Sequence, residues 1–351
     1  MGCRLLYLVK LVVALLPILA LVACGGTSAA PRAAGQSAPS GPDKIRIGHA
    51  KCAHCLPMAY MGDYVKEYPV EVTAFPTGTD VLTAISTGAL DVAQITYLHF
   101  MRAVEQGTPV IAISGQINGG SDLLLRKDVA VPPDDWAGLK QLISDYKARG
   151  TKFRIASSRG NAQDIHLRGE LARNGIDAVG DVEIVNIVNF ADHAAALEKN
   201  EVEMSATVEP FASQIRLSGI GVHFAYPYDQ PAGNLTNLIV ARKEFAERYP
   251  EAVTAAVRGV AAINAALEQN PQLWLDVIRK QTGLREEIAR EAINNAAPDI
   301  RMHKDKMRAI ARMMADLKYT SRDVSPELDK AVDYRFLEAA TGRKASELGN
   351  S

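Results

Sequence analysis

Apolar and polar positions along the first part of the chain predict strands that alternate with helices. Residues 44–48 and 70–75 have the alternation of a strand, and residues 56–67 between them have helical spacing. The pattern continues with apolar strands at 90–95 and 110–113, separated by another helical stretch. Strands that alternate with helices over short turns indicate βαβ units and a mainly parallel sheet.

The pattern restarts near Trp136 and changes again after Pro250. Strands are expected at 154–156, 182–188 and 204–208, with helices between them. From Pro250 onward the apolar positions follow helical spacing almost to the end of the chain. The sequence therefore predicts one α/β lobe, a second α/β lobe and a helical C-terminal tail.

The N-terminal segment is typical of an exported bacterial lipoprotein. The first ten residues include the basic Arg4 and Lys10 and no acidic residue. Residues 11–23 are apolar, but this run is shorter than the roughly 20 residues of a membrane span. The segment ends in Leu21-Val22-Ala23-Cys24-Gly25, which resembles a lipobox. Residues 1–23 are thus expected to be a signal peptide, and Cys24 is expected to carry a palmitate-type lipid that anchors the protein to a membrane. The alternative is an ordinary signal peptide with a chance cysteine.

Composition limits what the rest of the chain can do. Residues 24–42 are rich in Gly, Ala, Ser and Pro and lack large apolar side chains, so they are expected to form a flexible tether. The chain has 39 Lys and Arg against 40 Asp and Glu, without a basic stripe, which excludes nucleic acid as a partner. No second apolar run of membrane length occurs, so the body is expected to be soluble.

Several segments of the body, in order along the chain, resemble one known family. They are residues 75–80 and 84–92, 114–121, 206–212, 238–245 and 249–253. They are similar to the periplasmic binding proteins for alkanesulfonates, taurine, nitrate and thiamine-pyrimidine precursors, which have the type II binding-protein fold and serve ABC importers.

The resemblance implies an architecture and a set of partners. Lobe one would comprise residues 43–125 plus 237–340, lobe two residues 126–236, and residues 341–351 a C-terminal tail. A small solute would bind between the lobes, without catalysis, and an ABC permease with its ATPase would receive it. The protein would lie on the periplasmic side of the envelope, anchored through its lipid.

Candidate binding residues follow from the expected sheets. Ligands of open α/β sheets bind beyond the carboxyl ends of the strands, where helix N-termini present free N–H groups and partial positive charge. The candidates in the loops at these ends are Cys52, His54, Thr77, Gly78, Thr79, Tyr97, Asn118, Ser158, Asn161 and Glu209. Two alternatives stay open: Thr77–Thr79 could only cap a helix, and Tyr97 could only fill the core.

The segment Lys51-Cys52-Ala53-His54-Cys55 is unusual for such a loop. In an oxidising compartment Cys52 and Cys55 could form a disulfide. Reduced, Cys52, Cys55 and His54 could hold a soft metal, with His49 or His99 completing the shell. The third alternative is a pair of free thiols that only shape the pocket. No other cofactor is expected.

Two other functions remain as alternatives to import. One is an enzyme similar to the pyrimidine-precursor synthases, which share the fold; the export signal and the position of the cysteine loop argue against it. The other is a metal-responsive or redox-responsive binding protein that works without an importer.

Overall fold

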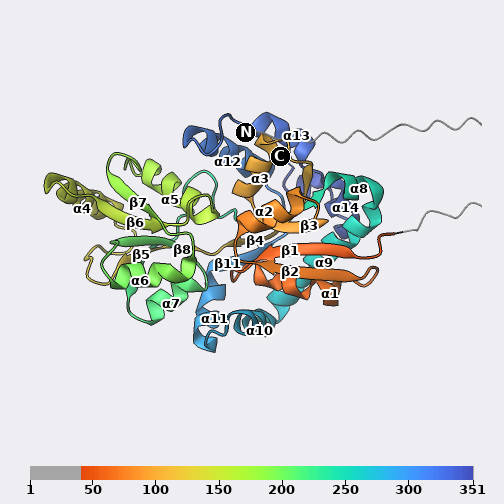
Figure 1. The fold of residues 1–351 in the computed structure, drawn as a ribbon, viewed down its shortest axis with the longest axis horizontal. Helices are drawn as coiled ribbons and strands as arrows, with labels where there is room; N and C mark the ends of the chain where they lie inside the picture. Colours follow the sequence, from red (N-terminus) through yellow and green to blue (C-terminus); the bar gives the residue numbers. More distant parts are fainter. Residues whose placement is uncertain (1–40, 351) are drawn as a thin grey trace, which may run out of the picture. The chain divides into compact units, whose positions relative to one another are not determined.

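The computed structural model describes residues 41–350, which are built around two β-sheets with helices on their faces (Figure 1). The predicted signal peptide, Cys24 and nearly all of the predicted tether lie outside the described residues. None of the described helices is long and apolar enough to cross a membrane.

The first sheet belongs to lobe one. Its strand order is β11-β4-β10-β3-β1-β2, where β1 is parallel to β2 and β3, and β10 is antiparallel to β3 and β4. Helices cover both faces, so β1 is buried along almost its whole length, unlike a strand with one wet face. The strands are β1 (Ile45–Ala50), β2 (Val70–Phe75), β3 (Val92–Thr96), β4 (Val110–Gly119), β10 (Asn237–Arg242) and β11 (Ala296–Asp299).

The helices of lobe one include the whole C-terminal part of the chain. The expected helix at 56–67 is split into η1 (Leu56–Tyr60) and α1 (Met61–Tyr64). The expected C-terminal tail is packed onto lobe one, because Leu348 is fully buried. The remaining helices are α2 (Gly78–Ser86), α3 (Tyr97–Glu105), α8 (Lys243–Arg248), α9 (Pro250–Gln269), α10 (Pro271–Thr282), α11 (Glu286–Ala292), η3 (Ile293–Asn295), α12 (Lys304–Asp316), η4 (Ser325–Glu327), α13 (Leu328–Ala331), α14 (Arg335–Thr341) and η5 (Ala345–Leu348).

The second sheet belongs to lobe two and has the order β7-β6-β8-β5-β9. Strand β6 is parallel to β7 and β8, whereas β5 is antiparallel to β8 and β9. Separate apolar clusters pack on its two faces. The elements are β5 (Ser121–Arg126), β6 (Phe153–Ser157), β7 (Val182–Asn186), β8 (Met204–Val208), β9 (Gly221–Ala225), α4 (Trp136–Ala148), α5 (Ala162–Arg173), η2 (Phe190–Asp192), α6 (His193–Glu198) and α7 (Phe211–Leu217).

The chain first passes from one sheet to the other at Gly119 and Gly120. Both have positive φ, 91° and 82°, which glycine adopts without strain and which lets β4 turn directly into β5. Because β5 pairs with β8 and β9, lobe two begins at residue 121 rather than at the expected residue 126. The α/β two-lobed fold class is confirmed. The expectation of mainly parallel sheets is too simple, since β5 and β10, which adjoin the two crossings, run antiparallel to their neighbours.

Candidate functional site

A small cavity lies between the two lobes, at the strand ends where the sequence predicts a ligand. Its volume is about 40 Å³, which is room for only a few water molecules, so the two lobes are closed on each other. The lining residues are Ala50, Lys51, Cys52, His54, Cys55, Pro76, Thr77, Gly78, Gln94, Thr96 and Thr236 from lobe one, and Ser121, Asn161, Ala162, Gln163, Phe190 and Val208 from lobe two.

Five of the ten candidate binding residues line this cavity: Cys52, His54, Thr77, Gly78 and Asn161. Thr77 also caps α2, because its side chain accepts a hydrogen bond from the Asp80 N–H. Thr77 therefore has both roles: it caps α2, as the alternative interpretation expected, and it also lines the cavity.

Three further candidates from lobe one have internal partners instead of facing the cavity. Thr79 is largely exposed at the start of α2, and its Oγ1 lies 3.3 Å from His99 Nε2. Tyr97 is 1% exposed and packs in the apolar core, as its alternative interpretation expected. Asn118 Oδ1 accepts a hydrogen bond of 3.0 Å from the Thr236 N–H, which fixes the second crossing between the lobes.

The two remaining candidates, from lobe two, are also used internally. Ser158 Oγ donates to the Val188 carbonyl at 3.0 Å. The Glu209 carboxylate is fully buried and accepts from Ser213 Oγ at 2.7 Å and from Arg216 at 2.9 Å. The carboxylate of Glu209 thus belongs to a buried charge cluster rather than to the cavity wall.

The cysteine loop, residues 51–55, forms one wall of the cavity. Cys52 and Cys55 are joined by a disulfide, the first of the three alternatives for this pair. The indole of Trp274 donates to the Ala53 carbonyl at 2.8 Å, and the Ala53 N–H donates to the Glu209 carbonyl at 3.0 Å. The loop is therefore held by lobe one and also contacts lobe two.

His54 brings an imidazole without a hydrogen-bond partner into the cavity wall. The residue is 2% exposed, and among the described residues Nδ1 has no partner. Burial, together with the nearby His166, lowers the pKa of His54 to about 3, so the ring is neutral. Gly120 leaves the space that the ring occupies, because a Cβ there would lie 2.3 Å from Nδ1. A buried polar atom left unpaired costs about 1–3 kcal/mol, so Nδ1 is suited to a ligand.

The N-terminus of α5 faces the same cavity. Asn161 occupies the N-cap position, but its side chain donates to Ser158 Oγ at 2.9 Å instead of capping the helix. Gln163, in the first turn, is 3% exposed and its Nε2 has no partner among the described residues. Free N–H groups and the positive end of the helix dipole favour an oxygen acceptor or an anion here.

The charges around the cavity favour the same kind of ligand. Among the lining residues there is no aspartate or glutamate, and the one with a full charge is Lys51, which is exposed at the rim. The hydroxyl-bearing residues Thr96, Ser121 and Thr236 complete the polar lining. These hydroxyls already bond to His99, His166 and the Gly119 carbonyl. The donors left for a solute are the Gln163 amide and the α5 N-terminus, which fit a compact solute with an oxygen-rich acceptor group.

A chain of buried amides supports the cavity from lobe one. Gln94 Oε1 accepts from the Ala50 N–H at 3.1 Å, and Gln94 Nε2 donates to Asn237 Oδ1 at 2.8 Å. Asn237 Nδ2 in turn donates to Gln116 Oε1 at 2.9 Å and to the His54 carbonyl at 3.2 Å. The amides therefore fix the backbone of the cysteine loop relative to β3, β4 and β10.

Direct contacts between the lobes close the cleft at its sides. Tyr228 donates to Asn295 Oδ1 at 2.8 Å, and Asn295 Nδ2 donates to the Ser121 carbonyl at 2.8 Å. Tyr319 of lobe one donates to Asp164 of lobe two. These bonds would have to break for a solute to enter from solvent.

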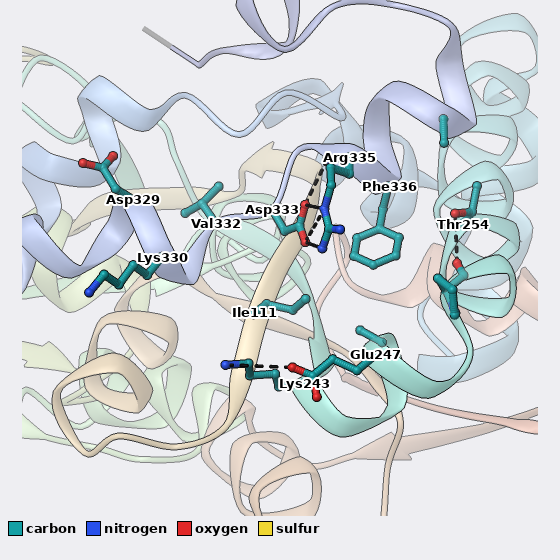
Figure 2. Close-up of a pocket in the computed structure, with 13 residues that line it drawn as sticks. Ile111, Lys243, Glu247, Thr254, Asp329, Lys330, Val332, Asp333, Arg335 and Phe336 are labelled. Carbon is teal, nitrogen blue, oxygen red and sulfur yellow. Dashed lines mark hydrogen bonds and ion pairs between the residues drawn. The ribbon is translucent and has the colours of Figure 1, made fainter.

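A larger groove of about 740 Å³ lies elsewhere on lobe one (Figure 2). Four of its charged groups are paired within the groove: Asp333 with Arg335 at 2.6 Å, and Lys243 with Glu247 at 4.0 Å. No unpaired buried polar atom of the described residues converges on it. The cavity between the lobes is therefore the better candidate site, although it is smaller.

Comparison with known proteins supports this architecture. A curated relative, the taurine-binding periplasmic protein of Escherichia coli (strain K12), is 23% identical over 208 residues, which cover 59% of this chain and 60% of the relative. The nitrate-binding protein NrtA of Synechocystis PCC 6803 superposes with a TM-score of 0.74 at 17% identity, covering 88% of this chain and 91% of that one. The alkanesulfonate-binding protein SsuA of Xanthomonas axonopodis pv. citri, bound to MOPS, gives 0.68 at 16% identity, covering 84% and 99%.

All three proteins are named as binding proteins. The model of the NMT1-like family matches residues 38–273, which include most of lobe one and all of lobe two. The chain belongs to the NMT1-like family.

Proposed function

We propose that the protein captures a small, oxygen-rich solute between its lobes and delivers it to the permease of an ABC importer. The observation that carries the proposal is a pair of buried side chains, His54 and Gln163, which line one cavity from opposite lobes. Each has a polar atom without a partner among the described residues, Nδ1 of His54 and Nε2 of Gln163. A solute that bonds to both stabilises the closed arrangement, because the two groups come together only when the lobes close.

The solute class follows from the donors and from the relatives. The α5 N-terminus and the Gln163 amide offer hydrogen bonds to an anionic or neutral oxygen group, and no acid in the lining repels an anion. Taurine, alkanesulfonates and nitrate, the solutes named for the relatives, share such a group. A sulfonate or nitrate-like anion is the solute class we propose.

The cellular setting is proposed from the N-terminal sequence. A lipid on Cys24 would hold the protein at the periplasmic face of a membrane, and residues 24–42 would give it reach to the permease. A permease and its ATPase are the partners that this arrangement requires.

The first test identifies the solute directly. Air-oxidised full-length protein is denatured, and the released small molecules are identified by mass spectrometry. Calorimetric titration with taurine, short alkanesulfonates and nitrate then measures affinity. A compound with a sulfonate or similar oxyanion group is expected, and a cationic or purely apolar solute would contradict the proposed class.

A matched pair of variants tests the location of the site. Gln163→Glu replaces the free amide with a carboxylate and should weaken binding of an anion by roughly tenfold or more, about 1.4 kcal/mol. Gln141→Glu makes the same change on the exposed face of α4, where the amide donates to Asp145, and should leave affinity unchanged. Equal affinities for the two variants would place the site elsewhere.

A further inference from the structure

We propose that reduction of the Cys52–Cys55 disulfide converts the cavity wall into a site for one soft monovalent metal ion, with Cu(I) as the representative ion. The sulfur atoms of Cys52 and Cys55 and a ring nitrogen of His54 lie within 4.8 Å of one another. This site is additional to solute capture and does not depend on it.

The oxidised loop already gathers the three ligand atoms, but its two sulfur atoms are bonded to each other and must separate before an ion can lie between them. Metal–sulfur bonds of about 2.3 Å and metal–nitrogen bonds of about 2.0 Å place ligand atoms about 4 Å apart around one ion. The three residues are 8%, 2% and 2% exposed, in the order Cys52, His54, Cys55, so the ion would be shielded from water. The imidazole of His54 keeps a nitrogen, Nδ1, that has no hydrogen-bond partner among the described residues.

The ligand types select a soft ion of low coordination number. Two thiolates and one imidazole favour Cu(I), whereas a closed zinc site takes four ligands and hard cations take oxygen ligands. No carboxylate of the described residues joins the three-residue group. Soft monovalent ions are therefore favoured over zinc, calcium and magnesium.

The surroundings also suit the charge of the complex. Two thiolates, one Cu(I) ion and a neutral imidazole carry a net charge of one negative unit. The uncapped N-terminus of α5 lines the same cavity, Lys51 stands at its rim, and the lining has no acid. The partial positive charge of the helix N-terminus and the full charge of Lys51 would therefore offset part of the free-energy cost of burying an anionic complex.

The chemistry requires a reductant, which we take to be a dithiol. The dithiol gives two electrons and two protons to the Cys52–Cys55 bond and is itself oxidised to a disulfide. Cu(I) then displaces both thiol protons to solvent as the two sulfur atoms coordinate it. The oxidised loop, by contrast, offers no thiolate.

The experiment uses the full chain with Cys3→Ser and Cys24→Ser, so that only the two loop cysteines can react. One sample is reduced anaerobically with a dithiol and freed of it by gel filtration, and the other is left oxidised in air. Both are titrated with Cu(I) held by bicinchoninate, whose colour is lost when the protein removes the ion. The reduced sample should remove one equivalent and the oxidised sample none, with a thiolate-to-Cu(I) absorption in the ultraviolet.

Variants then assign the ligands. Cys52→Ser and Cys55→Ser should each weaken Cu(I) binding by about 100-fold or more, and His54→Gln by about tenfold. His223→Gln, a partly exposed histidine outside the three-residue group, is the matched control and should bind as the parent does.

Three results would overturn the proposal. The first is that the reduced parent removes no Cu(I) from bicinchoninate, and the second is that a Cys52→Ser/Cys55→Ser double variant removes as much as the parent. The third is that the reduced parent binds Zn²⁺, titrated against a zinc chelator, more tightly than it binds Cu(I). Because the comparison of oxidised and reduced parent needs no substitution at a ligand, a ligand variant that fails to fold leaves the test intact. Solute binding is measured on the oxidised protein, so the two proposals fail separately.

Discussion

Arg216 bonds to two fully buried carboxylates, and its replacement with methionine should strongly destabilise lobe two. The guanidinium bonds to Asp122 and, at 2.9 Å, to Glu209, both of which have no exposed side-chain surface. Methionine keeps much of the apolar stem but removes the charge. Breaking a buried pair from one side costs about 3–5 kcal/mol, because the partner charges stay buried without compensation.

The loss should depend on pH, and its sign follows from the carboxylates. Burial raises the pKa of both Asp122 and Glu209, while the charge of Arg216 lowers both. Without Arg216 the folded-state pKa values rise further above those of the unfolded chain. The folded state then binds more protons than the unfolded state, so stability falls as pH rises from the unfolded pKa, about 4, through the folded values.

Histidine protonation acts in the same direction. A hydrogen bond to Asp122 raises the pKa of His223, so at acid pH His223 carries a positive charge beside that carboxylate. The destabilisation caused by Arg216→Met should therefore be smaller at pH 5.5 than at pH 8.

Urea unfolding of both proteins at the two pH values provides the measurement. Tryptophan fluorescence suits it, because Trp136 lies in lobe two and Trp274 in lobe one, and Trp274→Phe leaves only the lobe-two reporter. Arg290→Met, which removes one exposed pair with Glu286, is the matched control and should cost about 0.5 kcal/mol or less. A loss under about 1 kcal/mol at pH 8, or an equal loss at both pH values, would refute the reasoning.

Four other changes test different parts of the structure. Trp274→Phe removes the 2.8 Å hydrogen bond to the Ala53 carbonyl of the cysteine loop and should lower the free energy of unfolding by about 1 kcal/mol. It should also weaken solute binding in calorimetry, and unchanged affinity would show that this bond does not position the loop. Gly120→Ala places a Cβ 2.3 Å from His54 Nδ1 on a residue whose φ is 82°, and should lower the free energy of unfolding in urea by at least about 1–2 kcal/mol. Gly62→Ala, with open space around the new Cβ, is the control and should not destabilise the protein. Cys24→Ser should abolish incorporation of a palmitate analogue in cells, and equal labelling of both proteins would rule out the predicted lipid. X-ray scattering should show a smaller radius of gyration when an initially open, solute-free protein is saturated with solute, and no change would argue against lobe closure.

The order of elements could be predicted from sequence because the hydrophobic pattern is local. Strands at 44–48, 70–75 and 90–95 correspond to β1, β2 and β3, each within a few residues. The boundary between the lobes could not be placed in the same way. Ser121–Arg126 is apolar enough for either sheet, and its partners β8 and β9 lie far along the chain.

The candidate site could be predicted to the level of loops but not of side chains. Thr77 and Gly78 line the cavity, while Thr79, one residue further along α2, points to His99. Successive residues of a helix are rotated by about 100°, so neighbours at a helix start face different surroundings. Without the helix orientation, sequence cannot distinguish which of three adjacent residues meets the ligand.

Some residues missed at this stage did have a signal in the sequence. Gln94 is a polar residue within an otherwise apolar strand, and such a residue needs a buried hydrogen-bond partner, which Asn237 supplies. Gln163 lies in the first turn after a predicted helix start, where side chains approach ligands of the N-terminus. Thr236 and Ser121 had no such signal, because only tertiary pairing brings them to the cavity.

We expect the redox state of the cysteine loop to affect the closure of the lobes. A crosslink between residues three apart removes little chain entropy from the unfolded state, so its contribution to overall folding stability is small. Its effect is local: the loop it closes carries the Ala53 N–H that bonds to the Glu209 carbonyl of lobe two. Breaking the disulfide removes one restraint on that backbone, which Trp274 and the buried amides still hold. An open arrangement of the lobes would not contain the bond to Glu209 and would be affected less. Reduction should therefore shift the equilibrium between open and closed lobes far more than the equilibrium between folded and unfolded chain.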